Sequence, residues 1–255
     1  MPQRVAVKIC GVTDSADALL SAELGADYLG LNFWPGSPRY VGVEQAREIA
    51  AAVRAAAPRV SLVGVFVNPD RGFVEETAAA VGLDLLQFSG DEAAAAVRPF
   101  AARAIKALRT HDPAVAAEYA DCWGLLLDAP RVGGSAGSGA AGRGKETGRG
   151  VEAPLLAEDY GGTGRQWDYG AAAPILGGLD GSAGASARAG APGAARRVFL
   201  AGGLRPENVR RVVAALRPFA VDVCSGVESA PGRKDPRLLR QLFEEVRNGQ
   251  VDRPT

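Results

Sequence analysis

The chain has 255 residues, 47% of them hydrophobic, so it is long enough to bury a sizeable core within one large domain. Lysine and arginine number 29, as do aspartate and glutamate, and this zero net charge argues against a nucleic-acid or anionic-membrane partner. Three cysteines without CxxC spacing and a single histidine, His111, exclude a disulfide framework, a zinc site and histidine-based triads as starting hypotheses.

Short strand-like runs alternate along the chain with Ala-, Leu-, Glu- and Arg-rich stretches of helical period. The predicted strands cover residues 4–10, 27–33, 60–67, 83–89, 102–108, 122–128, 197–203 and 220–226. A helix is predicted after each strand, over residues 14–24, 43–56, 70–81, 91–100, 113–120, 168–174, 206–216 and 235–247. Strict alternation favours a closed parallel (β/α)8 TIM barrel over an open sheet, which more often carries a GxGxxG turn after its first strand.

Capping residues support two of the predicted helices. Asp14 precedes "SADALLSAELG", which closes on Gly25, and Pro206 stands in the first turn before "ENVRRVVAAL". This second helix also decides between two candidates for the seventh strand, "PILGGLDG" and "FLAGGLRPENV". We prefer the latter, because a capped amphipathic helix follows it while the former runs into low-complexity sequence.

Two Gly-, Ala- and Ser-rich segments interrupt the alternation, at about residues 131–160 and 177–196. With few bulky apolar residues, they bury too little surface to offset the entropy of ordering, and we expect them to be mobile. The pieces between them are too small to fold alone, so residues 1–255 are interpreted as one barrel domain with two loop insertions. The first insertion leaves a strand at the catalytic face, and the second enters one from the opposite face.

The carboxyl ends of the strands, where barrel enzymes hold their reactive groups, carry a short list of candidates. The first strand ends on Cys10 and the sixth on Asp128, and the second runs on into "NFWPGSPRY" with Arg39. Turns after the seventh and eighth strands, "AGGLRPEN" and "CSGVESAPG", let backbone N–H groups approach an anion closely. They predict a phosphate site built from Gly202, Gly203, Ser225 and Gly226.

A thiolate and a carboxylic acid that face each other suit a proton transfer in which one group takes a proton and the other gives one. With a phosphate site, this predicts isomerase chemistry on a phosphorylated small molecule, and no motif calls for a metal or an organic cofactor. Nucleophilic cysteine catalysis is the alternative, but it normally needs a histidine base, and His111 in "RTHDPA" reads as a surface loop residue. Reduced cysteines and the absence of a signal-like or membrane-spanning apolar run favour a cytoplasmic location.

The residue pattern of the first predicted strand also indicates which side chains line the barrel interior. Ala6, Lys8 and Cys10 share one face by the two-residue period of a strand, and that face is expected to line the lumen. A buried ammonium needs a partner, and Asp222 in the neighbouring eighth strand is predicted to supply it. Cys122 and Cys224 are interpreted as small buried hydrophobic residues.

Several stretches, in chain order, resemble the phosphoribosylanthranilate isomerase family. They are "VKICGVT", "GADYLGLNFWPGSPRYV", "VGVFVN", "LLLD", "GGTGRQWDY", "LAGGLRPENV" and "VDVCSGVESAPGRKD". The resemblance implies a cofactor-independent Amadori rearrangement of N-(5-phosphoribosyl)anthranilate, a step of tryptophan biosynthesis. Neither a nucleic-acid nor a membrane partner is expected, and the chain is expected to be a monomer or a homodimer.

By position, the resemblance also assigns roles to individual residues. Cys10 corresponds to the general base that removes the proton from the second sugar carbon, and Asp128 to the general acid that protonates the ring oxygen. Arg39 corresponds to the arginine that holds the anthranilate carboxylate, a task suited to a planar fork of donors. Two further glycines, Gly162 and Gly164, are expected to allow close approach to substrate.

One departure from the family lies after the fourth strand. The family usually reads "QLHGDE" there, whereas this chain reads "QFSGDE", with Phe88 and Ser89 in place of leucine and histidine. The two proposed catalytic residues are intact, so we expect chemistry to be retained and affinity or substrate range to change.

Three other functions compete with this assignment. A histidine-pathway aminoaldose–aminoketose isomerase shares the rearrangement and the phosphate loops, but its first-strand base resembles an aspartate rather than Cys10. Indoleglycerol phosphate synthase shares the fold but depends on a lysine and glutamates that we cannot place in this chain. A non-catalytic phosphate-ligand-binding barrel is the third alternative, and the presence of both Cys10 and Asp128 argues against it.

Overall fold

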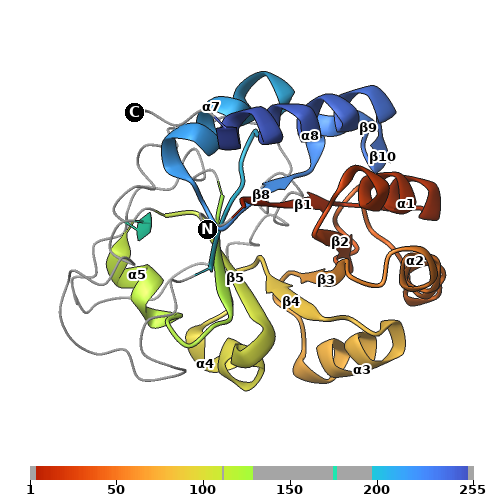
Figure 1. Cartoon of the computed structure of the whole chain (residues 1–255). Coiled ribbons are helices and arrows are strands. Elements are labelled where there is room, and N and C mark those ends of the chain that lie inside the picture. Colours follow the sequence, from red (N-terminus) through yellow and green to blue (C-terminus); the bar gives the residue numbers. More distant parts are fainter. Residues whose placement is uncertain (1–3, 111, 129–174, 177–196, 252–255) are drawn as a thin grey trace, which may run out of the picture.

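The computed structural model describes residues 4–110, 112–128, 175–176 and 197–251. Within these residues, parallel strands form a closed barrel in chain order, as the TIM-barrel prediction expected (Figure 1). The strands are β1 (Ala6–Cys10), β2 (Tyr28–Asn32), β3 (Ser61–Phe66), β4 (Leu85–Phe88), β5 (Ala104–Leu108), β6 (Gly124–Leu127), β7 (Arg197–Leu200) and β8 (Ala220–Val223).

Helices surround this barrel as an outer layer, with α7 and α8 side by side (Figure 1). They are α1 (Ser15–Leu24), α2 (Val43–Ala56), α3 (Arg71–Val81), α4 (Ala94–Val97), α5 (Pro113–Glu118), α7 (Pro206–Leu216) and α8 (Pro236–Val251). The preferred seventh strand is confirmed as β7. The predicted helix at 168–174, both insertions and His111 lie outside the described residues.

Local sequence signals account for the ends of several helices. The Asp14 carboxylate accepts a hydrogen bond from the backbone N–H of Asp17 at 2.8 Å, and Gly25 ends α1 with a φ of 111°. Pro206 is the first residue of α7, where its missing N–H costs nothing, and the Asn208 side chain accepts from the backbone N–H of Arg205 at 2.9 Å.

The predicted helix over 91–100 is wrong at its start. The α-helix begins only at Ala94 and continues as the 3₁₀ helix η1 (Arg98–Arg103), which has proline in its first turn. The carboxylate of Glu92 accepts hydrogen bonds from the backbone N–H groups of Asn68 and Gly90, which holds the preceding residues in a turn. Local helix propensity in this alanine-rich stretch is overridden by that tertiary contact.

The amino-terminal part of the barrel lumen is apolar and is closed by aromatic side chains. Tyr28, Trp123, Phe199 and Phe219 form a mutual cluster with ring centroids between 5.3 and 6.5 Å apart. The guanidinium of Arg197 stacks on Trp123 at 4.7 Å. A second, larger core fills the space between the strands and the helices. The barrel is therefore a packed scaffold whose open, polar end is the opposite one.

Beyond β8 the chain forms a 3₁₀ turn, η4 (Ser225–Val227), and then a short hairpin of β9 (Glu228–Ala230) and β10 (Arg233–Lys234). The hairpin lies between α8 and α1 in Figure 1. It is fastened to the start of the chain, because the Thr13 hydroxyl donates to the carbonyl of Gly232 and the Asp17 carboxylate accepts from the N–H of Lys234. The hairpin is thereby held beside the end of β1.

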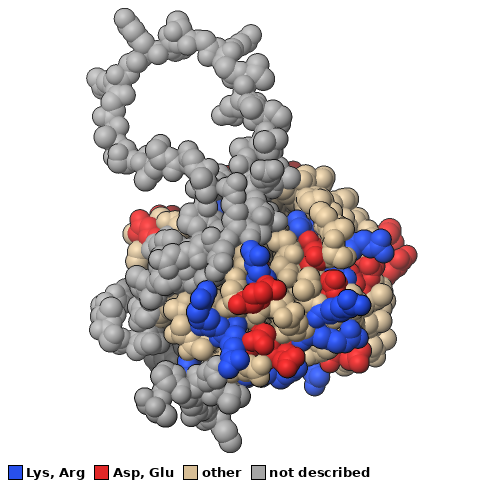
Figure 2. Space-filling model, turned by 90° about the horizontal axis from the view of Figure 1, so that it is seen from above, with Lys and Arg blue, Asp and Glu red and all other residues tan. Residues whose placement is uncertain are grey.

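The described surface matches the balanced composition. In the face shown in Figure 2, lysine and arginine side chains are interspersed with aspartate and glutamate. Among the helices of the described residues, none combines the length and apolar character needed to cross a membrane.

Candidate active site

Cys10 is the last residue of β1 and lies at the carboxyl-terminal rim of the barrel, 9% exposed. The neighbouring strand makes room for it, because Gly30 pairs with Cys10. A Cβ atom at Gly30 would stand 2.8 Å from the Cys10 sulfur and 3.2 Å from Nζ of Lys8, which is too close for both. The absence of a side chain on β2 thus opens the space in which the thiol and the ammonium sit.

Lys8 and Asp222 form an ion pair inside the barrel, as the strand period predicted. Nζ of Lys8 lies 2.7 Å from Oδ1 of Asp222, with the side chains 0% and 8% exposed. The residues face each other directly in the β1–β8 register. Burial alone would lower the pKa of Lys8, but the Asp222 carboxylate outweighs burial and raises it, so the ammonium stays charged beneath Cys10.

Cys224 faces Cys10 across the same pair of strands, one residue beyond the end of β8. A hydrogen bond from the Cys224 thiol is the main cause that lowers the pKa of Cys10 to about 7; burial opposes the shift and the charge of Lys8 supports it. The pKa of Cys224 is raised well above its usual value for the converse reason. Reading Cys224 as a hydrophobic filler missed this contact, because it depends on how β8 aligns with β1.

Arg39 enters the site from the loop after β2 and is 8% exposed. Its Nε and Nη2 atoms donate to the carboxylate of Glu228 at 3.0 and 2.6 Å. The side chain passes close to Gly11, where a Cβ atom would stand 2.8 Å from Cδ of Arg39 and 3.0 Å from the Cys224 sulfur. Gly11 also has a φ of 70°, so both its backbone and the space beside it favour glycine.

Asp128 directly follows β6, and its backbone N–H bonds the carbonyl of Leu108 at 2.9 Å, which continues the β5–β6 ladder. Leu126, two residues earlier, lines the lumen, so by the period of the strand Asp128 is on the lumen side at the rim. Only β7 and β8 separate its strand from β1 in the barrel order. Cys10 and Asp128 thus belong to the same end of the barrel.

The turns after β7 and β8 approach each other where the phosphate site was predicted. Gly202 and Gly203 have φ angles of 86° and 69°, a left-handed conformation that lets successive backbone N–H groups form an anion-binding concavity. A Cβ atom at Gly226 would collide with the carbonyl oxygen of Leu204. Ser225 begins η4 beside it. The two loops therefore meet closely, and Gly162 and Gly164 lie outside the described residues.

The two residues that depart from the family pattern have different surroundings. Phe88 belongs to the outer core, where its ring centroid lies 5.5 Å from that of Phe100. Ser89 is 5% exposed and accepts a hydrogen bond from Nε2 of Gln87 at 3.0 Å. Oε1 of Gln87 is buried and has no hydrogen-bond partner in the structure described here. Any effect on substrate is expected from Ser89 rather than Phe88.

Sequence reasoning missed two further charged residues at the rim, Glu228 and Lys234 of the hairpin. The Lys234 ammonium lies 2.8 Å from Oε1 of Glu228 and 2.6 Å from the carbonyl oxygen of Cys10. Both side chains are almost fully buried. The segment "GVESAPGRKD" reads as a polar turn, and the only hint of this role is that charges follow the eighth strand so closely.

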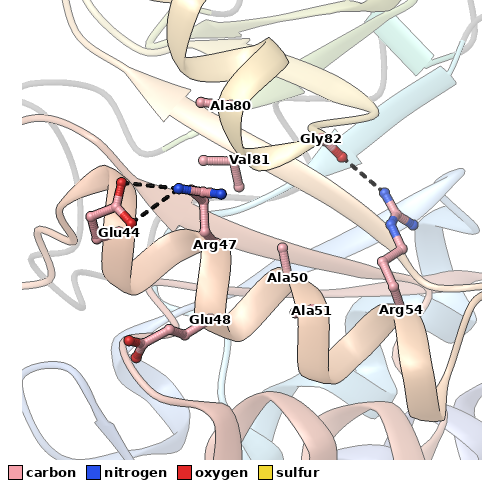
Figure 3. Close-up of a pocket in the computed structure, with 9 residues that line it drawn as sticks. All are labelled: Glu44, Arg47, Glu48, Ala50, Ala51, Arg54, Ala80, Val81 and Gly82. Carbon is pink, nitrogen blue, oxygen red and sulfur yellow. Dashed lines mark hydrogen bonds and ion pairs between the residues drawn. The ribbon is translucent and has the colours of Figure 1, made fainter.

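A surface groove elsewhere has a different character. It lies between α2 and α3, has a volume of about 520 Å³ and is shown in Figure 3. Arg47 pairs with Glu44 of the same helix, and Arg54 donates to the carbonyl of Gly82. Both arginines therefore already have partners in the outer helical layer, and the groove contains neither Cys10 nor Asp128, so the rim is the better candidate for catalysis.

The fold and the rim together are those of an enzyme of the (β/α)8-barrel class, and comparison with known proteins agrees. A family model described as N-(5'phosphoribosyl)anthranilate (PRA) isomerase matches residues 7–245. The chain belongs to this family.

Curated relatives and solved structures support the same assignment. N-(5'-phosphoribosyl)anthranilate isomerase of Myxococcus xanthus is 40% identical over 252 residues, covering 96% of this chain and 97% of that protein. The Citrifermentans bemidjiense enzyme is 38% identical, covering 94% and 96%. The crystal structure of the Thermus thermophilus enzyme matches with a TM-score of 0.70 and 34% identity, over 95% of this chain and 98% of that one. A phosphoribosyl anthranilate isomerase in complex with reduced 1-(o-carboxyphenylamino)-1-deoxyribulose 5-phosphate matches with a TM-score of 0.70 and 31% identity, with the same coverage.

Proposed function

We propose that this chain catalyses the Amadori rearrangement of N-(5'-phosphoribosyl)anthranilate to 1-(o-carboxyphenylamino)-1-deoxyribulose 5-phosphate. The observation that carries the proposal is the environment of Cys10, a rim thiol whose pKa lies at about 7. A general base works best when its pKa is close to the operating pH. A thiol that served only to fill the core would not need a hydrogen-bond donor and a buried ammonium beside it.

In the proposed reaction, Asp128 starts by donating its proton to the ring oxygen of the sugar. The bond between that oxygen and the first sugar carbon breaks, and the nitrogen lone pair forms a C=N double bond to that carbon. The Cys10 thiolate then removes the proton from the second carbon. The electron pair of that C–H bond becomes a double bond between the first and second carbons, and the C=N pair returns to nitrogen to give an enolamine. Its first carbon then gains a proton and its hydroxyl loses one, which gives the aminoketose. No electrons leave the substrate, so the step needs no redox cofactor.

The remaining rim residues are proposed to bind the two anionic ends of the substrate. Arg39 receives the anthranilate carboxylate, for which a planar guanidinium fork is suited. The loops with Gly202, Gly203, Ser225 and Gly226 receive the phosphate, and Gly162 and Gly164 are proposed to approach the substrate from the loop that returns after β6. A thiol that must stay reduced fits a cytoplasmic location.

A fluorescence assay that follows the loss of phosphoribosylanthranilate tests the proposal directly. Wild-type protein is expected to consume the substrate, whereas Cys10→Ala protein purified in the same way is not. The aminoaldose substrate of histidine biosynthesis serves as the specificity control and is expected to remain unchanged. Wild-type protein that fails to convert phosphoribosylanthranilate would refute the proposal.

A further inference from the structure

The β9–β10 hairpin contributes a buried carboxylate that two cations share. Oε1 and Oε2 of Glu228 accept from Nε of Arg39 at 3.0 and 3.2 Å, and Oε2 also accepts from Nη2 at 2.6 Å. Oε1 receives a further hydrogen bond from Nζ of Lys234 at 2.8 Å. The side chains of Arg39, Glu228 and Lys234 are 10%, 4% and 0% exposed. Burial of three charges together is costly, so the ion pairs and hydrogen bonds among them must offset the cost of removing them from water.

The pairing with Glu228 fixes the plane of the Arg39 guanidinium. Because the group is planar, contacts at Nε and Nη2 orient the whole fork and turn the edge with Nη1 away from Glu228. Burial alone would raise the pKa of Glu228, but the hydrogen bond from Arg39 and the charge of Lys234 lower it, so the carboxylate stays ionised. The pKa of Arg39 is correspondingly raised, since Glu228 outweighs the opposing effect of burial.

Arg39, Glu228 and Lys234 carry two positive charges and one negative charge between them. Arg39 and Lys234 are both cations, and Glu228 is the carboxylate that contacts both of them. Asp17 lies nearby, but its carboxylate accepts from the backbone N–H of Lys234 rather than from the ammonium. The Lys234 ammonium is fully buried and already donates to Glu228 and two carbonyl oxygens, so Arg39 is the cation of this cluster suited to receive a second carboxylate, and the proposed substrate carries one on its aromatic ring.

Lys234 joins this cluster to the strand that carries the proposed base. Its ammonium donates to the carbonyl oxygens of Cys10 at 2.6 Å and of Cys224 at 3.3 Å, the residues at the ends of β1 and just beyond β8. The Cys224 sulfur lies 3.9 Å from Oε1 of Glu228. One side-chain network therefore sets both the direction of the Arg39 fork and the position of the backbone beneath the thiol.

We propose that Glu228 is a positioning residue of this enzyme: it orients Arg39 toward the substrate carboxylate and, through its bond to Lys234, fixes Arg39 relative to the backbone of Cys10. This inference rests on the proposed function and deepens it. Glu228 does not touch the reacting atoms, and it acts through Arg39. Its effect is therefore confined to ligands that carry the carboxylate.

Binding of two matched ligands to the purified full-length protein tests this. One ligand is reduced 1-(o-carboxyphenylamino)-1-deoxyribulose 5-phosphate, and the other is its phenylamino counterpart, which lacks only the carboxylate. In Glu228→Gln protein, the amide NH₂ group faces donors where an oxygen accepted, so the fork loses its fixed direction. The expected result is about tenfold weaker binding of the carboxylate ligand, with binding of the counterpart changed less than about twofold.

Two further variants show whether the effect passes through Arg39. In an Arg39→Ala background, Glu228→Gln is expected to cause no further loss of discrimination between the ligands, because the residue it orients is gone. Glu228→Asp keeps the negative charge on a shorter side chain, and it replaces Glu228→Gln in this test if that protein does not fold. The expected loss of affinity for the carboxylate ligand is then smaller than about tenfold. Glu92→Gln removes the carboxylate of another buried lysine pair, with Lys106, and is expected to leave the ratio of the two affinities unchanged.

The outcomes separate this inference from the function on which it rests. Equal loss of both ligands in Glu228→Gln protein, or no loss of the carboxylate ligand, overturns the positioning role while leaving the isomerase assignment intact. Wild-type protein that binds neither ligand overturns the proposed function and this inference together. Equal discrimination in Arg39→Ala and in the double variant, with a loss in Glu228→Gln alone, supports positioning through Arg39, whereas a further loss in the double variant overturns it.

Discussion

The two ends of the barrel lumen are built from opposite kinds of side chain. At the amino-terminal end, Tyr28, Trp123, Phe199 and Phe219 pack ring against ring. At the carboxyl-terminal end, charged and thiol side chains are buried among hydrogen bonds, with Lys8 and Asp222 beneath Cys10 and the Glu228 cluster beside it. Burial of aromatic area is favourable, whereas burial of charge is costly unless each charge is paired.

This difference indicates that the two ends of the lumen are stabilised in different ways and that the chemistry is confined to one of them. The aromatic end is stabilised by packing of rings against one another. The polar end requires particular partners at particular distances, because each of its groups is stable only while its neighbour is present. Substitutions at the aromatic end are therefore expected to change stability alone, whereas those at the polar end change catalysis, stability or both. Five experiments test that contrast, ordered by the expected size of the effect.

The proposed acid and base give the largest expected effect. Cys10→Ala and Asp128→Asn are each expected to lower kcat by at least about a hundredfold, the scale of general acid–base catalysis. Substrate affinity should change much less, and the melting temperature should stay close to that of the wild type. Steady-state kinetics with a parallel thermal melt measure both quantities, and near-normal turnover of Cys10→Ala protein would contradict the mechanism.

The Lys8–Asp222 ion pair beneath Cys10 is expected to contribute strongly to stability. Lys8→Met leaves the Asp222 carboxylate buried without its partner, at a cost of about 3–5 kcal/mol in the free energy of unfolding. Denaturant titration measures this cost. A second substitution, Asp222→Leu, is expected to restore much of the loss, because it removes the uncompensated charge. If the double variant is no more stable than Lys8→Met alone, the pair does not act as a unit.

The aromatic end should respond in stability alone. Phe199 is fully buried, and Phe199→Ala is expected to lower the free energy of unfolding by about 3–5 kcal/mol through lost packing and the cavity left behind. Phe73, which is 43% exposed, gives the matched control, since Phe73→Ala should cost far less. The kcat of the folded Phe199→Ala protein should remain near the wild-type value. A large fall in kcat would mean that the two ends are coupled.

The contact between Cys10 and Cys224 is expected to influence the pH dependence of kcat/KM. Because the base must be a thiolate, kcat/KM is expected to have an ascending limb near pH 7, where Cys10 titrates, and a descending limb where Asp128 loses the proton it must donate. Cys224→Ala removes the hydrogen bond that favours the thiolate, so the pKa of Cys10 rises and the ascending limb moves to higher pH. Cys224→Ser retains a donor and should keep the limb close to its original place.

The charged groups around Cys10 bear on the same experiment. Five charged residues lie in or beside this part of the rim, and none of them changes in the Cys224 variants. They are Lys8, Asp222, Arg39, Glu228 and Lys234. A limb that stays in place in Cys224→Ala protein would show that these charges, and not the second thiol, set the pKa of Cys10.

The smallest expected effect belongs to the departure from the family pattern. Ser89→His is expected to lower KM modestly by returning a ring donor to the rim, with little change in the pH profile of kcat. Phe88→Leu is the matched control, because Phe88 packs in the outer core and should leave KM unchanged. Equal KM values for wild type and Ser89→His would mean that this position does not contact substrate.

Much of the barrel could be predicted because its signals are local. Each strand is a short apolar run, and Asp14, Gly25 and Pro206 mark helix ends through contacts within a few residues. The Lys8–Asp222 pair was also predictable, since the strand period and the closure of β8 on β1 place both residues in one lumen. The start of α4 was not, because the side chain of Glu92 is held by backbone N–H groups that a helix pattern does not reveal.

The rim was predictable by residue type but not by contact. Cys10 and Arg39 follow from strand ends and family motifs, whereas the opposition of Cys224 to Cys10 follows only from the alignment of β8 with β1. The contacts of Glu228 and Lys234 are harder to predict, because they form only when the short hairpin after the last strand folds back onto the first strand. No pattern within "GVESAPGRKD" carries the identity of such distant partners.

The hydrogen bond from Lys234 to the carbonyl of Cys10 spans 224 positions of sequence, nearly the whole chain. During synthesis the thiol emerges first and its surroundings emerge almost last, since Asp222, Cys224, Glu228 and Lys234 all belong to the final segment. A nascent chain that lacks this segment carries an ordinary cysteine with the ordinary reactivity of a thiol. The surroundings of the proposed base are therefore complete only when β8 and the β9–β10 hairpin have closed onto β1.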